Sequence, residues 1–157
     1  MNVEAFMTKL DNLSKGERTA LKRECGTMLQ RADGAAISAF YRCLPAGTSE
    51  KQESRSFAVA CIHCLWEEGT GVPIEKLFSF LRMESDTAEK RLAAVTDMPW
   101  DEDGLFLAKL VRLIKMAKQK GYQVDTQQLL KDLLNWDSEK RYVQRRWLKT
   151  MYINQED

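Results

Sequence analysis

Residues 105–120 decide the fold, and they read LFLAKLVRLIKMAKQK. Their apolar members recur at helical spacing, and at about 100° per residue they fall within a stripe roughly 120° wide. The stripe consists of Phe106, Leu107, Leu110, Leu113, Ile114 and Ala117. The opposite side gathers Lys109, Arg112, Lys115 and Lys120. This pattern predicts an amphipathic helix with one face in a core and a cationic face in solvent.

Two more helices are expected after this one. Gly121 supplies a helix stop, because glycine tolerates the left-handed backbone that closes a helix. Asp125 then begins a helix that runs to Trp136, with Gln128 as a capping-box partner. A final helix is expected over about 138–152. Trp136, Trp147 and Tyr152 fall among helical apolar positions, which favours core packing over base stacking.

The whole chain has the composition of an ordinary globular protein. It has 157 residues, of which 44% are hydrophobic and 30% charged. Three prolines and a shortage of alternating Val, Ile and Thr argue against a sheet. We therefore expect an all-α protein, a compact bundle of roughly seven to nine helices. A single domain over 1–157 is expected, with two sub-bundles at about 1–95 and 96–157 as the alternative.

No segment predicts a membrane or secretory protein. No apolar run approaches the ~20 residues that a bilayer-spanning helix needs. The first thirteen residues, MNVEAFMTKLDNL, lack the continuous apolar core of a secretion signal. We expect a cytoplasmic protein.

Charge is unevenly distributed along the chain, although the formal net charge is only +1. Residues 105–149 carry eleven Lys and Arg against four Asp and Glu, a local net charge of +7. Residues 84–104 carry seven acids against two bases, a local net charge of −5. A basic face suits phosphate binding, because each neutralised phosphate releases counterions. Solvation of exposed helix faces is the alternative reading.

Other basic residues are candidates for the same role. Lys15, Arg18 and Lys22 recur on one face of a helix that a Ser14 and Glu17 capping box begins. Arg42 and Arg82 are interpreted either as strand contacts or as caps of helix C-termini.

The residues that could carry catalysis or bind a metal give weak signals. Cys61 and Cys64 have the spacing of half a zinc site, but no second pair completes it. Four reduced cysteines packing a helical core is the favoured reading. His63 is the one histidine, and no motif frames a nucleophile. The acidic run of residues 101–103 precedes a helix, where capping is favoured over metal binding. We expect no cofactor, no metal and no enzymatic activity.

Four stretches together resemble a known family. They are GERTALKR at 16–23, AFYRCLP at 39–45, FSFLR at 78–82, and a C-terminal ending. The ending combines residues 129–136 with VQRRWLKTMY at 143–152, and it is the most specific of the four. The chain resembles the CasB family, the small subunit of the type I-E CRISPR surveillance complex Cascade.

The resemblance implies an all-helical, non-catalytic subunit that binds nucleic acid without reading its sequence. Its expected partners are the target and displaced DNA strands of the R-loop, the guide RNA, the backbone and large subunits of Cascade, and a second copy of itself. Guide pairing reads sequence in such complexes, while protein charge holds the strand backbones. The expected contact residues are Lys15, Arg18, Lys22, Arg42, Arg82, Lys109, Arg112, Lys115, Arg141, Arg145, Arg146 and Lys149.

Two other classes of function stay open from the sequence. A helix-turn-helix transcription regulator would place a recognition helix in the major groove, and the turn at 121–125 permits one. A protein–protein adaptor would use its basic helices to meet acidic partners, without nucleic acid.

Overall fold

The computed structural model describes residues 1–153, which form nine α-helices and one short 3₁₀ helix. The helices are α1 (Val3–Asp11), α2 (Lys15–Arg23), η1 (Leu29–Arg31), α3 (Gly34–Cys43), α4 (Glu50–His63), α5 (Ile74–Glu84), α6 (Asp86–Thr96), α7 (Leu105–Gln119), α8 (Thr126–Leu134) and α9 (Tyr142–Tyr152). A single isolated β-bridge, and no sheet, is present within residues 1–153. The all-α prediction is confirmed. None of the helices described is both long enough and apolar enough to cross a bilayer.

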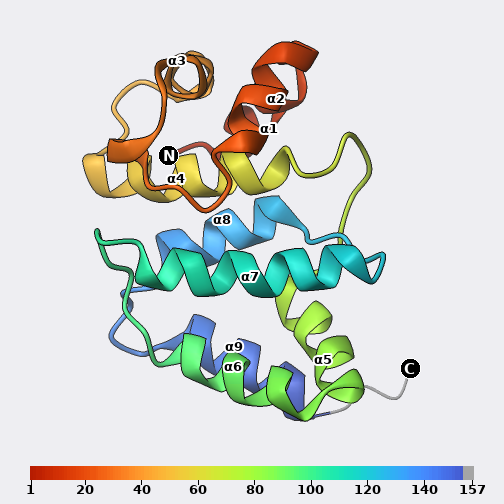
Figure 1. Ribbon diagram of the computed structural model, residues 1–157. Coiled ribbons are helices and arrows are strands. Elements are labelled where there is room, and N and C mark those ends of the chain that lie inside the picture. Colours follow the sequence, from red (N-terminus) through yellow and green to blue (C-terminus); the bar gives the residue numbers. More distant parts are fainter. Residues whose placement is uncertain (154–157) are drawn as a thin grey trace.

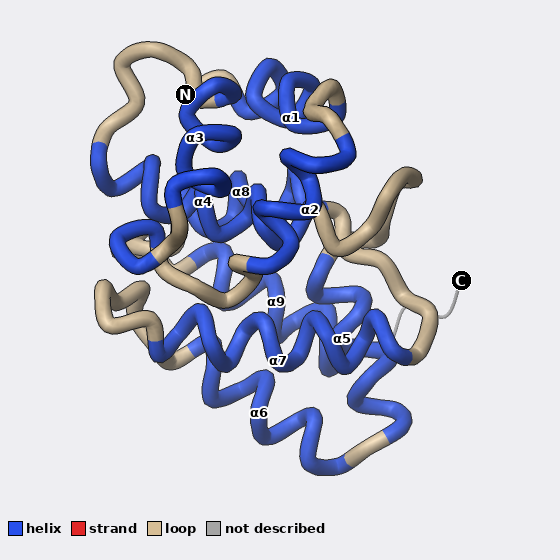
Figure 2. The backbone as a smooth tube through the Cα atoms, turned by 45° about the horizontal axis from the view of Figure 1, so that its top comes forward, coloured by secondary structure: helices blue, strands red, loops and turns tan. Residues whose placement is uncertain are grey.

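The helices pack in three levels (Figure 1). The first four helices lie at the top, α7 and α8 run across the middle, and α5, α6 and α9 lie at the bottom. Helix α8 packs on α4 and α1, whereas α9 packs on α5 and α6. Helices from either side of residue 95 therefore interleave in one arrangement (Figure 2). The single domain over 1–157, with sub-bundles at about 1–95 and 96–157 as the alternative, stays a prediction.

Helix α7 forms as the sequence predicts, because its apolar stripe is fully covered. All six predicted stripe residues are buried, and Val111 is buried beside them. Gly121 has a φ of +90°, so it closes the helix with the left-handed backbone expected of it. The basic residues Lys109, Arg112 and Lys115 remain exposed on the other side.

The start of α8 differs from the prediction in one hydrogen bond. The Asp125 carboxylate accepts from the Gln128 backbone N–H at 3.1 Å, which is one half of a capping box. The other half is absent, since the Asp125 N–H donates to the Val72 carbonyl at 2.7 Å. The Gln128 side chain donates instead to Asp132.

That backbone bond belongs to a short parallel bridge between Val72 and Val124. The Val72 N–H donates to the Gln123 carbonyl at 2.9 Å, so the segment before α5 is tied to the segment before α8. Gly71 permits this close approach, because a Cβ at this position would collide with the backbone of Val124. The bridge fixes where α5 leaves the upper helices.

The last two helices are shorter than predicted. Helix α8 ends at Leu134, two residues early, although Trp136 is buried as expected. Helix α9 begins at Tyr142, about four residues late. Arg141 has a φ of +51°, and a right-handed helix does not run through a left-handed residue. Trp147 is buried as predicted, but Tyr152 is 45% exposed and lies against Arg82 instead of in the core.

The cysteines are free and pack in the interior, as predicted. Cys43, Cys61 and Cys64 are buried, and Cys25 is partly buried. Burial raises the pKa of Cys25 and of Cys64 to about 11. Thiolates are therefore scarce at neutral pH, and these side chains act as small hydrophobes.

Asp101 caps α7, which is the role predicted for the acidic run. Its carboxylate accepts from the backbone N–H groups of Leu105 and Phe106 at 2.9 and 2.8 Å. Desolvation on its own would raise the pKa of Asp101. The backbone hydrogen bonds outweigh it and lower this pKa below its usual value. The charged carboxylate is the form that stabilises the fold.

We predict that Asp101→Ala lowers the free energy of unfolding by about 1 kcal/mol at pH 7, since it removes a helix cap. Because the pKa of Asp101 is lowered in the folded state, its charged carboxylate stabilises the fold above the ordinary carboxyl pKa. This stabilisation is lost as the pH falls through the folded-state pKa. Urea unfolding of both proteins at pH 7, 5 and 3 measures this. Equal stability at pH 7, or a difference that grows toward pH 3, would contradict the capping role.

Candidate nucleic-acid interface

The twelve predicted contact residues divide into two groups in the structure. Six arginines are engaged in hydrogen bonds or ion pairs within the chain: Arg18, Arg42, Arg82, Arg141, Arg145 and Arg146. The side chains of the other six make no hydrogen bond or ion pair with any residue of 1–153: Lys15, Lys22, Lys109, Arg112, Lys115 and Lys149. The side-chain charges of the second group are therefore unpaired within this range.

Two arginines of the upper helices are held by local partners. Arg18 donates to the backbone carbonyls of Leu10 and Trp66 at 3.1 and 3.0 Å, so it ties α2 to the ends of α1 and α4. It is therefore turned away from the exposed ridge on which the sequence placed it with Lys15 and Lys22. Arg42 forms an ion pair with Glu17 across α2 and α3.

Arg82, Arg141 and Arg145 also have partners inside the chain. The Arg82 guanidinium lies 3.5 Å from Glu89 and packs over the Tyr152 ring, 5.2 Å from its centroid. Arg141 donates to the Thr96 carbonyl, which joins the start of α9 to the end of α6. Arg145 donates to the Lys140 carbonyl at 3.1 Å but remains exposed.

Arg146 is the most deeply engaged of the six. Its Nε donates to Glu75 Oε2 at 2.6 Å, and its Nη2 lies 2.5 Å from Asp132 Oδ1. Asp132 also accepts from the indole N–H of Trp147 at 2.9 Å and from Gln128 at 2.9 Å. Both carboxylates are buried and come from α5 and α8. Although burial opposes its charge, the Asp132 and Glu75 partners raise the pKa of Arg146, which stays a cation.

The sequence predicts Arg146 as an exposed strand contact, whereas the structure pairs it with two buried carboxylates. Asp137, a carboxylate shortly before α9, pairs with Lys51 and Arg55 of α4. Arg55 was missed by the sequence analysis. It is almost completely buried, donates to the Leu133 carbonyl, and lies over the Trp100 ring.

Three of the six unpaired cations, Lys109, Arg112 and Lys115, line a groove between α6 and α7. Two adjoining hollows of about 490 and 100 Å³ share Arg91 and Arg112 in their walls. Lys115 lines one hollow and Lys109 the other. The floor is apolar, from Ala94, Val95, Ala108, Val111, Leu113 and Met116. We call this feature, with its four cations Arg91, Lys109, Arg112 and Lys115, the basic groove.

No carboxylate within residues 1–153 lines either hollow of the basic groove. Arg91 was missed because it lies in the acidic segment 84–104 of the sequence, where it had no basic neighbours except Lys90. Its association with Arg112 comes from the packing of α6 beside α7, which is visible in Figure 1. No described residue of α9 lines the groove, so the α9 cations are not part of it.

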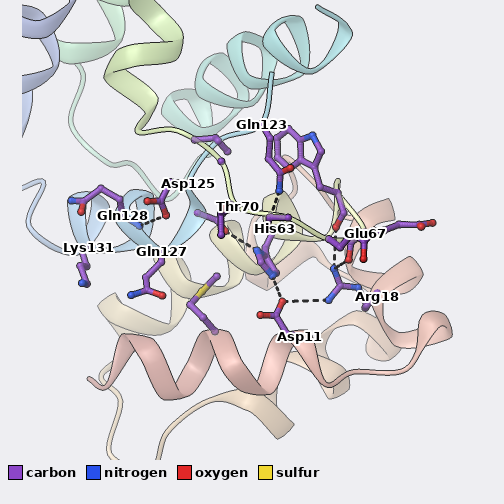
Figure 3. Close-up of a pocket in the computed structure, with 17 residues that line it drawn as sticks. Asp11, Arg18, His63, Glu67, Thr70, Gln123, Asp125, Gln127, Gln128 and Lys131 are labelled. Atoms are coloured by element: carbon purple, nitrogen blue, oxygen red, sulfur yellow. Dashed lines mark hydrogen bonds and ion pairs between the residues drawn. The ribbon is translucent and has the colours of Figure 1, made fainter. Parts of the chain in front are cut away.

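Another hollow, of about 620 Å³, lies between α1, α4 and α8 and has mixed charge (Figure 3). His63 Nε2 lies 2.6 Å from Asp11, and Nδ1 lies 2.7 Å from the Thr126 hydroxyl. A carboxylate, an imidazole and a hydroxyl in a row resemble a nucleophilic triad. However, the Thr126 hydroxyl belongs to a buried residue at the first turn of α8. The three groups join α1, α4 and α8.

Metal binding has no support among the side chains of residues 1–153. No group of three or more His, Cys, Asp or Glu in this part of the chain is placed to hold an ion. The cysteine pair predicted to pack the core does so at the end of α4.

Comparison with protein-family models identifies the family. The model of the CRISPR-associated protein Cse2 matches residues 17–152. The chain belongs to the Cse2 family. The match includes α3 to α9 and most of α2. It therefore contains the basic groove and the ion pairs of Arg146 with Glu75 and Asp132, which we call the Arg146 network. Comparison with curated proteins gave no match.

Solved structures show the same fold as this Cse2-family chain. A Cse2-family protein from Thermus thermophilus superposes with a TM-score of 0.79 at 24% identity, covering 96% of this chain and 97% of that one. The crystal structure of M. ruber CasB gives a TM-score of 0.75 at 17% identity, with 97% and 93% covered. A chain of a CRISPR RNA-guided surveillance complex gives 0.73 at 19% identity, with 95% and 90% covered.

We predict that Arg146→Ala destabilises the fold by about 3 kcal/mol, because it leaves two buried carboxylates without their cation. Arg146 is itself 35% exposed, so solvent screening keeps the value at the low end of the range for buried pairs. Urea unfolding at pH 7 measures the loss.

The neighbouring Arg145→Ala is the matched control for this change. Arg145 is exposed and bonds only to a backbone carbonyl among residues 1–153, so its loss is expected to change stability by no more than ~0.5 kcal/mol. Similar losses in the two variants would show that the Arg146 network does not hold α5, α8 and α9 together.

Proposed function

We propose that this Cse2-family chain is a non-catalytic subunit of a Cascade-type surveillance complex that binds nucleic acid without reading its sequence. In this role it holds the target and displaced DNA strands while the R-loop forms. The observation that carries the proposal is the basic groove, in which four cations without partners in residues 1–153 surround an apolar floor that no carboxylate of this range lines.

The chemistry of the basic groove favours backbone binding over base reading. Arginine and lysine attract phosphates of any sequence, and each phosphate that they neutralise releases counterions. The walls, as far as the structure describes them, contain no Asn, and their one Gln is Gln119 at the end of α7, so side chains suited to base edges are scarce. Guide pairing would supply the sequence specificity, and the groove would stabilise a strand exchange that is nearly balanced on its own.

Other exposed cations extend the proposed contact surface. Lys15 and Lys22 lie on α2, and Lys149 lies on α9, and the side chain of each makes no hydrogen bond or ion pair among residues 1–153. The six paired arginines are expected to have a mainly structural role. Apart from Arg145, their guanidinium groups join separate segments of the chain, and they contribute to the field around the molecule more than to direct contact.

Family membership supports the proposed partners. The partners are the backbone and large subunits, the guide RNA, and a second copy of the chain in the same complex. One of the similar structures is a CRISPR RNA-guided surveillance complex, and its chain shares the fold over 95% of this one.

The structure disfavours the helix-turn-helix alternative. A recognition helix must present a free face to the major groove. Helix α8, which follows the turn after α7, packs on both α4 and α1 and buries Leu129, Leu130 and Leu133. Contacts within residues 1–153 therefore leave it without a free face of the required kind.

We predict that Arg91→Gln/Arg112→Gln weakens binding of mixed-sequence single-stranded and duplex DNA by about tenfold at low salt, with no sequence preference. The slope of log K against log salt is expected to fall by about 1.4 to 1.8, because two phosphate contacts are lost. Fluorescence anisotropy across a salt titration measures both quantities.

Lys9→Gln/Lys76→Gln is the matched control, since it removes two exposed cations outside the basic groove. Its expected effect on affinity is less than twofold. Equal weakening in both double variants would mean that net charge alone matters and that the groove is not the contact site. Binding that depends on sequence would contradict the proposal outright.

A further inference from the structure

A groove of opposite charge lies between η1, α3 and the start of α4. It has a volume of about 760 Å³ and is lined by Leu29, Gln30, Ile37, Tyr41, Glu50, Lys51, Glu53, Ser54 and Glu102. We call it the acidic groove. Glu50, Glu53 and Glu102 come from the first turn of α4 and from the loop before α7, so the fold brings them together.

The one cation in the described lining, Lys51, is paired with a carboxylate outside the groove. The Lys51 ammonium lies 2.5 Å from Asp137, which pairs with Arg55 as well. Glu50 and Glu102 make no side-chain hydrogen bond or ion pair with residues 1–153. Glu53 is hydrogen-bonded to the Tyr41 hydroxyl, and this contact raises the pKa of Tyr41. With three carboxylates against one ammonium in its described lining, the groove carries a net negative charge.

Ser54 adds a second and independent observation. This residue lines the acidic groove and is only 8% exposed, yet its Oγ has no hydrogen-bond partner within residues 1–153. A buried hydroxyl without a partner is unfavourable, because its lost hydrogen bonds to water are not replaced. Its hydroxyl can accept a hydrogen bond from an N–H donor, and the carboxylates beside it would attract a donor that is charged.

The remaining walls suit the stem and the face of a long basic side chain. Tyr41 is 48% exposed, so part of its ring is open for a cation to lie over. Leu29 and Ile37 supply apolar surface against which the methylene chain of arginine or lysine packs.

We propose that the acidic groove is a docking site for an arginine or lysine side chain carried by a segment of a partner protein. Nucleic acid is a poor occupant, because three carboxylates repel phosphate. A metal ion is also a poor occupant, since no cluster of ligands suited to one exists within residues 1–153. The two grooves give the chain one surface for a basic polypeptide and another for phosphate.

The proposal is tested with the full chain and a fluorescein-labelled peptide, acetyl-Gly-Arg-Gly-Arg-Gly-Arg-Gly, at low salt. Fluorescence anisotropy is expected to show binding that Glu50→Gln/Glu102→Gln weakens by about tenfold. The control Glu67→Gln/Glu68→Gln removes the same charge from the exposed loop after α4, and its expected change is less than twofold. The readout is peptide binding, so it does not depend on the proposed nucleic-acid function.

Ser54→Ala separates recognition from folding. It leaves the charge of the chain unchanged, so weaker peptide binding in this variant reports the loss of the hydroxyl. Its unfolding midpoint is expected to stay the same or to rise, because an unsatisfied buried hydroxyl is removed. Weaker binding with undiminished stability supports the site, and unchanged peptide affinity in Ser54→Ala overturns the role given to this residue.

Three further outcomes would overturn the docking site as proposed. Equal weakening by both pairs of glutamate substitutions would reduce the effect to net charge. Absence of peptide binding by the wild-type chain at low salt would remove the ligand class. Self-association in analytical ultracentrifugation that Glu50→Gln/Glu102→Gln abolishes would assign the acidic groove to a second copy of the chain.

Discussion

The guanidinium of Arg146 between Glu75 and Asp132 is the interaction on which the lower half of the molecule depends. Two carboxylates taken out of water are costly unless a cation and further hydrogen-bond donors accompany them. Arg146 provides the cation, and Trp147 and Gln128 provide the donors to Asp132. Because Glu75, Asp132 and Arg146 belong to α5, α8 and α9, meeting this electrostatic requirement fixes three helices at once.

The same requirement explains why the arginines and lysines of this chain behave differently. A planar guanidinium can satisfy several acceptors at fixed geometry, whereas an ammonium on a flexible stem stays hydrated. Arg18, Arg55 and Arg141 all donate to backbone carbonyls that lie far away in sequence. Lys15, Lys22, Lys109, Lys115 and Lys149 remain exposed. Arg23, Arg91 and Arg112 are exceptions, and the last two line the basic groove.

Local features were predictable from the sequence, and associations between distant segments were not. The stripe of α7, the stop at Gly121 and the cap at Asp101 depend on neighbours close by in the chain, so pattern and charge sufficed to find them. Most of the basic groove was found in this way, through Lys109, Arg112 and Lys115. Arg91 was missed because only the packing of α6 on α7 brings it to Arg112. The partners of Arg146, Glu75 and Asp132, are 71 and 14 residues away in the chain. Helical periodicity does not indicate which of the many carboxylates at such distances will meet Arg146.

We propose that strands bind at the basic groove and not along the arginines of α9. An NMR titration of the ¹⁵N-labelled chain with a short mixed-sequence single strand distinguishes the two surfaces. If strands bind at the basic groove, amide shifts concentrate in α6 and α7, around Arg91, Lys109, Arg112 and Lys115. Shifts concentrated in α9 around Arg145 and Arg146, with α6 and α7 unaffected, would contradict it.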